Sequence, residues 1–313
     1  MDSSFQDNAL LAFSLLSLVT PHQDSDKVLV REPGERNYGP ERRAADLAKE
    51  SWEYALLSAW AYKNHWAEQI ATMAVADAGD AQKWESLIDT HWERWTDFPS
   101  NALKADAEER GLYFDIYESR SPTDPKRIVI AFRGTEGTSW LDWRANLRWF
   151  TRFIPKFRDQ YTVVSEDLVV EFTEQLIARN LNNDGVELIT TGHSLGGGLA
   201  QQFAYALKAP EGSDASIQPV SYVYAFHPSP VTGWFSVPPE IRDRNAENLR
   251  IDRIFEHGEI LAYIRLFLSK FYPPSAKAPA IREIRFNFVD SKSTTTNHEI
   301  RDFAIHLAQH ARA

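Results

Sequence analysis

The chain contains 313 residues, with 34 Lys and Arg against 44 Asp and Glu, which gives a formal net charge of −10. This acidic balance argues against nucleic acid as a partner. The absence of cysteine excludes a disulfide framework, a thiolate metal site and a thiol nucleophile. A chain of this length can bury a full core, and we expect one principal domain at residues 43 to 313 after a short N-terminal helix and loop at residues 1 to 42.

The N-terminal segment from residue 8 to 19 is largely apolar and has the length of a signal-peptide core. The residues before it are acidic and no cleavage site of the small-x-small type follows, so we interpret it as an N-terminal helix. It is too short to cross a bilayer, which requires about 20 residues. We therefore expect no transmembrane segment, and either a cytoplasmic location or export without a cleavable signal peptide. Proline, glycine and charged residues at positions 21 to 42 indicate a connecting loop.

Residues 43 to 110 are expected to form a helical N-terminal layer. From Ala44 to Trp60, apolar side chains recur at three- and four-residue steps, which places them along one helix face. The helical character continues to about Trp95. Tryptophans thicken this layer, and we interpret them as packing residues rather than as part of a cofactor site. They are Trp52, Trp60, Trp66, Trp84, Trp92 and Trp95.

The pattern after residue 110 is that of a sheet. Residues 111 to 117 alternate, residues 121 to 125 carry a turn signal and residues 127 to 132 are a short apolar run, which together indicate a β-hairpin. Further apolar runs alternate with helical patterns, so the sequence predicts an α/β fold with a mostly parallel central sheet and helices on both faces. These segments are the strands at 186 to 191, 220 to 226 and 249 to 255, and the helices at 199 to 207 and 298 to 312.

The most informative segment is Gly-His-Ser-Leu-Gly-Gly-Gly at residues 192 to 198. It follows a predicted buried strand and precedes a predicted helix, which is the context that a serine nucleophile on a sharp strand-to-helix turn requires. In that context the helix N-terminus directs backbone N–H groups at a developing oxyanion. We therefore predict Ser194 as a nucleophile, and the alternative is a glycine-rich turn without chemistry.

A second segment, Phe-Arg-Gly-Thr at residues 132 to 135, ends the strand before the nucleophile strand. Acyl transfer requires two donors at the oxyanion, one from the residue after the nucleophile and one from a loop after an earlier strand. The N–H groups of Leu195 and Thr135 fit these two positions, and Gly134 allows the loop backbone to approach the substrate. Taken alone, the tetrapeptide is more typical of a plain turn.

These motifs, together with two others, resemble the class 3, fungal-lipase-like branch of the α/β-hydrolases. The other two are Phe-His-Pro-Ser-Pro-Val-Thr-Gly at residues 226 to 233, and Arg-Ile-Phe-Glu-His-Gly-Glu at residues 253 to 259, which is similar to the family's acid-bearing strand and loop. The resemblance implies an α/β-hydrolase fold. It also implies a triad of serine, acid and histidine that hydrolyses carboxylic esters of lipids without a metal or cofactor.

The sequence leaves the identity of the triad acid open. Glu259 stands where the family usually has Asp, in the loop after the predicted strand, and a glutamate can also hold an imidazole in the correct tautomer. Glu256 is the nearest rival. Asp252 matches the family by residue type but lies in the middle of the predicted strand, whereas catalytic groups come from loops beyond the carboxyl ends of strands. We expect Glu259 to be the acid, with Glu256 and Asp252 as alternatives.

The order serine, acid, histidine along the chain places the catalytic base after the acid. Among the histidines that remain, His306 and His310 fall on the surface of the final helix, beside its apolar stripe. His298 stands where a loop enters that helix, so we predict it as the base, and the alternative is a capping or surface histidine. His193, within the turn that carries the serine, is expected to be structural.

Residues 136 to 160 follow the oxyanion segment, where the family usually carries a lid. Basic residues recur here at four-residue steps beside aromatic ones, and residues 143 to 158 include no acidic residue. Such an element either settles at an anionic lipid interface or packs by its aromatic side chains with a solvated basic face. A second basic aromatic stretch lies at residues 263 to 272. The candidate lid and interface residues are Trp143, Arg144, Arg148, Trp149, Phe150, Arg152 and Phe153.

The sequence thus predicts a serine hydrolase of lipid esters, of the lipase or phospholipase A type. The two basic aromatic elements favour a phospholipid or membrane-bound substrate and peripheral contact with an anionic membrane. One alternative is an antibacterial phospholipase effector exported by a specialised secretion system, and a housekeeping cytoplasmic esterase is also compatible. A further alternative is an α/β-hydrolase scaffold without catalysis that binds lipid or protein. The sequence indicates no particular protein partner.

Overall fold

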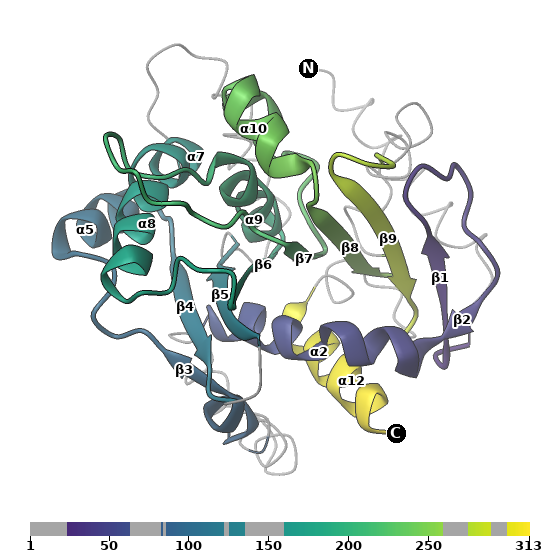
Figure 1. Ribbon diagram of the computed structural model, residues 1–313. Coiled ribbons are helices and arrows are strands. Elements are labelled where there is room, and N and C mark those ends of the chain that lie inside the picture. The colour runs from purple at the N-terminus through teal and green to yellow at the C-terminus, as the bar shows by residue number, and fades with distance from the viewer. Residues whose placement is uncertain are drawn as a thin grey trace, which may run out of the picture.

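The computed structural model describes residues 24–62, 83, 86–121, 125–134, 160–258, 275–288 and 299–313. In this part of the chain nine strands form one sheet in the order β2-β1-β9-β8-β7-β6-β5-β4-β3 (Figure 1). Strands β5 to β9 run parallel to their neighbours among themselves, and the edge strands pair antiparallel. The prediction of a mostly parallel central sheet is therefore confirmed.

The bounds of the strands follow their order in the chain. The parallel strands are β5 (Lys126–Phe132), β6 (Val186–His193), β7 (Tyr222–Phe226), β8 (Arg250–Glu256) and β9 (Ala280–Phe286). The antiparallel strands are β1 (Lys27–Arg31), β2 (Arg42–Arg43), β3 (Trp92–Arg94) and β4 (Phe114–Ser119). The hairpin expected from the alternation after residue 110 is the pair β4 and β5.

Helices cover both faces of the sheet, as predicted (Figure 1). On one face α2 (Ala44–Trp60) and α12 (Ile300–Arg312) pack against each other and against the sheet. On the other face lie α8 (Val169–Ala178) and α9 (Leu195–Ala206). The remaining helical elements are α5 (Asn101–Glu109), α7 (Gln160–Val163), the π-helical turn η2 (Val164–Leu168), the 3₁₀ turn η3 (Trp234–Ser236) and α10 (Pro239–Ala246). Within the described residues, every helix is too short or too polar to span a membrane.

Helices enclose β6 on both faces and exclude water from it, so its buried polar side chains require hydrogen-bond partners within the protein. The Thr191 hydroxyl donates to the carbonyl of Tyr224 at 2.9 Å and lies 2.7 Å from the hydroxyl of Ser58 on α2. The Thr190 hydroxyl, on the opposite face, donates to the carbonyl of Ala200 on α9 at 2.9 Å. These bonds join the central strand to both helical layers.

The interpretation of residues 21 to 42 as a loop is wrong for β1 and β2. Val28 and Val30 of β1 alternate in the sequence and are buried in the core beneath α2 and α12. On the opposite face of the strand, the buried side chain of Arg31 forms an ion pair with Glu283 of β9. The strand is short and lies between turn residues, so its alternation is a weak signal without its partner strand.

Two further strands depart from the expected pattern. The helical interpretation of residues 43 to about 95 is confirmed for α2 and for residues 86 to 91, but it is wrong for β3, which pairs with β4. β9 was not predicted, because its charged residues interrupt its apolar ones. Both strands gain their stability from pairing with segments that lie elsewhere in the chain.

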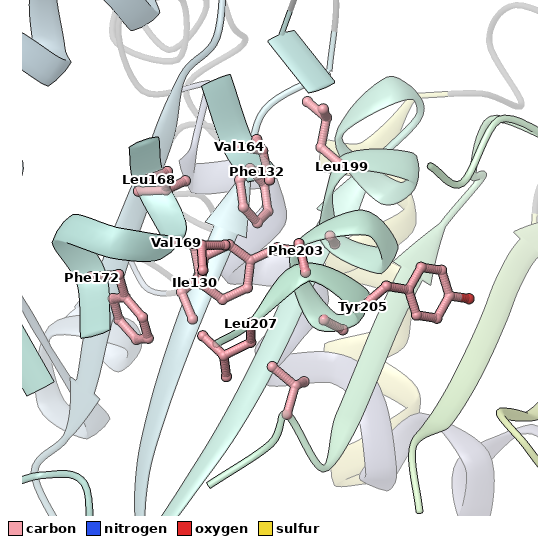
Figure 2. Packing of buried hydrophobic residues seen from close by; sticks show 14 of the residues in the cluster. Ile130, Phe132, Val164, Leu168, Val169, Phe172, Leu199, Phe203, Tyr205 and Leu207 are labelled. Atoms are coloured by element: carbon pink, nitrogen blue, oxygen red, sulfur yellow. The ribbon is translucent and has the colours of Figure 1, made fainter. Parts of the chain in front are cut away.

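Aromatic side chains fill the core between the sheet and its α8 and α9 face. Figure 2 shows Phe132 of β5, Phe172 of α8 and Phe203 of α9 within this layer. The ring of Phe172 is fully buried, and its centroid lies 5.4 Å from that of Phe203 and 6.1 Å from that of Trp95. Because Phe203 belongs to α9, this packing holds α9 against the sheet.

Replacement of Phe172 by alanine should lower the free energy of unfolding by about 3 to 5 kcal/mol, because it leaves a cavity in this layer. Urea denaturation measures the change. The matched control is Phe235→Ala, since the Phe235 side chain is 87% exposed, and it should alter the free energy by less than about 0.5 kcal/mol. Equal stability of the two variants would contradict this account of the core.

Candidate active site

Ser194 occupies a strained turn between β6 and α9. Its backbone has φ 56° and ψ −121°, a conformation that non-glycine residues rarely adopt. Hydrogen bonds hold both sides of the residue: its N–H donates to the carbonyl of Phe226 at 2.9 Å, and its carbonyl accepts from Gly197 at 3.1 Å and from Ser229 at 2.9 Å. Strain of this kind persists only where the surroundings fix it, and it is typical of a serine at a nucleophile elbow.

Glycine at position 196 allows the strand and helix to meet this closely. A Cβ atom at Gly196 would lie 2.3 Å from the carbonyl oxygen of Phe132 at the end of β5. A contact of that length with backbone is not tolerated, so a larger residue would displace either α9 or the end of β5. Leu195 is the first residue of α9, and its N–H is one of the helix N-terminal groups that lack an intrahelical acceptor.

Gly134 brings the end of β5 against the serine. A Cβ atom at this position would lie 2.6 Å from the carbonyl oxygen of His193 and 3.1 Å from the Cβ atom of Ser194. The N–H of Gly134 donates to the hydroxyl oxygen of Tyr62 at 2.8 Å. The segment after β5 therefore begins in contact with the serine, and the N–H of Gly134 is engaged by Tyr62 rather than directed at a substrate.

Tyr62 links this segment to the residue before the serine. Its hydroxyl lies 3.0 Å from Nδ1 of His193. The Tyr62 hydroxyl therefore contacts both the N–H of Gly134 and the ring of His193. His193 is buried, in agreement with the structural role expected for it.

Tyr62 was not identified from the sequence. It stands two residues after the end of α2, among the many aromatic residues of the N-terminal layer. Only its proximity to Gly134 and His193 in the folded chain distinguishes it from the packing residues.

A second histidine connects the ends of β7 and β8. His227 is fully buried and adopts a positive φ of 43° directly after β7. Its Nε2 accepts from the backbone N–H of Glu256 at 3.0 Å, and its ring meets that of His193 edge to face at 5.4 Å. The carboxyl ends of three parallel strands are thus held together through His193, His227 and the backbone of Glu256.

The two alternative acids described by the structure differ in their surroundings. Asp252 lies in the middle of β8, where its buried carboxylate accepts from Arg282 at 2.5 and 2.8 Å and from the Tyr222 hydroxyl at 3.0 Å. Burial raises the pKa of Asp252, while Arg282 and Tyr222 oppose the rise. Glu256 is the last residue of β8 and is also buried. Asp252 therefore has a structural ion pair, whereas Glu256 stands at the edge of the sheet that carries Ser194.

Several residues predicted for the site lie outside the described residues, and the structure does not test their roles. They are Thr135, Glu259, His298 and the candidate lid residues Trp143, Arg144, Arg148, Trp149, Phe150, Arg152 and Phe153. In the ranges that the structure does describe, no group of three or more His, Asp or Glu side chains is arranged to hold a metal ion.

A mostly parallel sheet with helices on both faces and a strained serine between a central strand and a helix is the arrangement of the α/β-hydrolase fold. A family model described as a Tle-like phospholipase domain matches residues 53–212, slightly more than half of the chain. The chain therefore belongs to the Tle-like phospholipase domain family. The matched region includes Gly134, Ser194 and all of α9.

Comparison with solved structures finds similar lipases. One is a fungal lipase in an inhibitor complex, described as a model for interfacial activation in lipases, with 17% identity, a TM-score of 0.38 and coverage of 75% of this chain and 78% of that one. Another is the native propeptide complex of Rhizomucor miehei lipase, with 14% identity, a TM-score of 0.37 and coverage of 79% of this chain and 67% of that one. No curated protein matches the chain in sequence.

Replacement of Tyr62 by phenylalanine should lower kcat for a chromogenic ester by roughly 10- to 100-fold, because small displacements of positioned groups have effects of this size. The variant loses the hydrogen bonds to Gly134 and His193 and keeps the ring. The control is Tyr54→Phe, which removes a hydroxyl bonded to Arg127 at the opposite end of β5. An equal effect of both changes on kcat would contradict a positioning role for Tyr62.

Replacement of Asp252 by asparagine should reduce the free energy of unfolding by about 1 to 3 kcal/mol, because Arg282 loses its buried partner and keeps only its ion pair with the exposed Glu50. The specific activity of the folded protein should stay close to that of the wild type. Urea denaturation and ester hydrolysis measure the two quantities. Asp243→Asn, at an exposed ion pair with Arg242, is the control and should change neither. Full stability with lost activity would instead identify Asp252 as the catalytic acid.

Proposed function

We propose that this protein is a serine hydrolase of lipid carboxylic esters, of the lipase or phospholipase A type. The strained backbone of Ser194, held between β6 and α9, is the observation that carries the proposal. Strain at a single serine that is fixed by three backbone hydrogen bonds has a ready explanation in nucleophilic catalysis. Membership of the Tle-like phospholipase domain family supports the same reaction class.

In the proposed mechanism the Ser194 hydroxyl attacks the acyl carbonyl while His298 takes its proton. Glu259 orients His298, and the N–H groups of Leu195 and Thr135 stabilise the oxyanion. His298 then returns the proton to the departing alcohol oxygen as the carbon–oxygen bond of the ester breaks. A water molecule then attacks the carbonyl of the acyl-enzyme while His298 takes its proton. His298 returns the proton to the Ser194 oxygen as the acyl-enzyme bond breaks, which releases the fatty acid.

The described geometry supports this assignment of the oxyanion donors. Leu195 begins α9, so its N–H and the helix dipole both face the turn that carries Ser194. Thr135 follows Gly134, which lies against Ser194. Tyr62 engages the N–H of Gly134, so we propose the N–H of Thr135, the next residue in the sequence, as the oxyanion donor in place of that of Gly134.

Glu259 remains our proposed acid and Glu256 its closest alternative. Asp252 is disfavoured because Arg282 and Tyr222 occupy its carboxylate oxygens in the middle of β8. Glu256 ends β8 at the carboxyl end of the sheet, where Ser194 also stands, and Glu259 comes three residues later in the sequence. Comparison of Glu259→Gln with Glu256→Gln separates them, since loss of the true acid should lower kcat by about 10⁴-fold.

A phospholipid is the proposed substrate class. The family description names a phospholipase, and the basic aromatic stretches at residues 143 to 158 and 263 to 272 suit an anionic lipid surface. A second candidate function, an antibacterial phospholipase effector exported by a specialised secretion system, fits the name of the family model. Serine-dependent toxicity on direction to a bacterial periplasm would favour this second candidate over a housekeeping esterase.

The central test is fatty-acid release from anionic phospholipid vesicles and from a triacylglycerol emulsion. The wild-type protein should release fatty acid from the vesicles, and Ser194→Ala should release it at least about 1,000-fold more slowly. Ser213→Ala, which changes an exposed serine on a turn, is the control and should retain full activity. Undiminished release by Ser194→Ala would refute the mechanism, and release from the emulsion alone would identify a triacylglycerol lipase.

A further inference from the structure

A cavity of about 420 Å³ lies beside the end of β5, and its lining falls entirely within the described residues. Its walls come from the end of β3, the helix α5, the beginning of β4 and the residue after β5. Because β4 runs antiparallel to β5, the beginning of β4 lies at the same edge of the sheet as Ser194. The volume is within the range of about 300 to 1,000 Å³ that is usual for small-molecule sites.

Arg133 connects this cavity to the candidate active site. Its side chain lines the cavity, and its backbone leads directly to Gly134, which lies against Ser194. The N–H of Arg133 donates to the carbonyl of Tyr113 at 3.0 Å, and its guanidinium carbon lies 3.7 Å from the centre of the Tyr113 ring. The side chain is therefore held in the cavity wall, one residue from the glycine that touches the serine.

The charges of the lining select for a polar, anionic ligand. Three cationic side chains and two carboxylates line the cavity. Arg94 lies 2.6 Å from Asp115 and Lys104 lies 4.0 Å from Glu108, and the cationic side chains of the lining outnumber its carboxylates by one. The lining also contains apolar side chains, among them Trp95, Phe98 and Leu112, but an acyl chain placed here would desolvate the charged groups without adding a hydrogen bond to them. A phosphate group suits these walls, since a planar guanidinium can bind two of its oxygens at once.

We propose that this cavity is a headgroup subsite, in which Arg133 binds the phosphodiester of a glycerophospholipid while the ester carbonyl lies at Ser194. The proposal rests on the function proposed above and specifies its substrate. In a glycerophospholipid only a short glycerol segment joins the phosphate to the acyl ester, and the proposal places these two groups at neighbours of Gly134: Arg133, which precedes it in the chain, and Ser194, which lies against it. A triacylglycerol has no group for Arg133, so the same contact discriminates against it.

Binding tests the cavity without hydrolysis. Calorimetric titration of Ser194→Ala with sn-glycero-3-phosphocholine should give saturable binding, and the added change Arg133→Gln should weaken it at least tenfold. Arg242→Gln, which changes an arginine stacked on Trp234 away from the cavity, is the matched control and should leave binding intact. Inorganic phosphate should bind more weakly. Equal binding of inorganic phosphate would overturn the assignment to a lipid headgroup, as would binding that survives Arg133→Gln.

Selectivity tests the same residue during turnover. In mixed micelles, Arg133→Gln should lower kcat/KM for a phospholipid at least tenfold and leave kcat/KM for a diacylglycerol within about twofold. An equal loss on both substrates would mean that Arg133 only supports Gly134, and would overturn the proposal.

Two further variants keep the proposal testable if Arg133→Gln does not fold. Arg133→Lys keeps the charge and should retain more phospholipid hydrolysis than the glutamine variant. Lys104→Gln, on α5, should raise KM for the phospholipid severalfold without changing diacylglycerol hydrolysis, and no change in that KM would count against the subsite. Absence of all hydrolysis by the wild type would refute the proposed function, whereas absence of headgroup binding by an active enzyme would refute only the subsite.

Discussion

The backbone of Ser194 is the constraint on which the rest of the structure around the site depends. Its positive φ is unfavourable and persists because Phe226, Gly197 and Ser229 hydrogen-bond its peptide groups. These partners come from β7, from α9 and from the loop after β7. The order of the strands and the seating of α9 must therefore be correct before the serine can adopt this conformation. The aromatic core beneath α9 supports that seating at a distance from the serine.

Hydrogen bonds between polar side chains and the backbone also fix the positions of the neighbouring strand ends. Tyr62 joins the N–H of Gly134 to the ring of His193, and His227 accepts from the backbone of Glu256. These bonds hold together the carboxyl ends of β5, β6, β7 and β8, from which the segments bearing the proposed oxyanion donor and acid continue. Polar groups enclosed in this way are costly to leave without partners, so the network also favours one arrangement of the strand ends.

Two groups of charged side chains near the site have different roles. The protein is acidic overall, yet the cavity beside β5 carries an excess of positive charge, and this local charge is what suits it to a phosphate. In the middle of β8, the buried Asp252 pairs with Arg282 of β9, which also contacts Glu50, and this ion pair joins the two strands. The charged groups of the cavity line a space that a ligand can enter, whereas the Asp252–Arg282 ion pair is a structural link between two strands. For this reason Asp252 is not our preferred acid, although aspartate is the residue type that the family resemblance leads us to expect.

The sequence by itself determined the serine turn, the segment before Gly134, the central strands β5 to β8 and the final helix, because each is marked by residues that are neighbours in the chain. It also disfavoured Asp252, whose mid-strand position follows from local periodicity. Only the tertiary structure decided that β1, β3 and β9 are strands, because short segments with interspersed charges acquire a strand conformation from their partners. It alone brought Tyr62 to Gly134 and His193, and Arg133 to the cavity, because these contacts join segments that are distant in sequence and no local pattern encodes them.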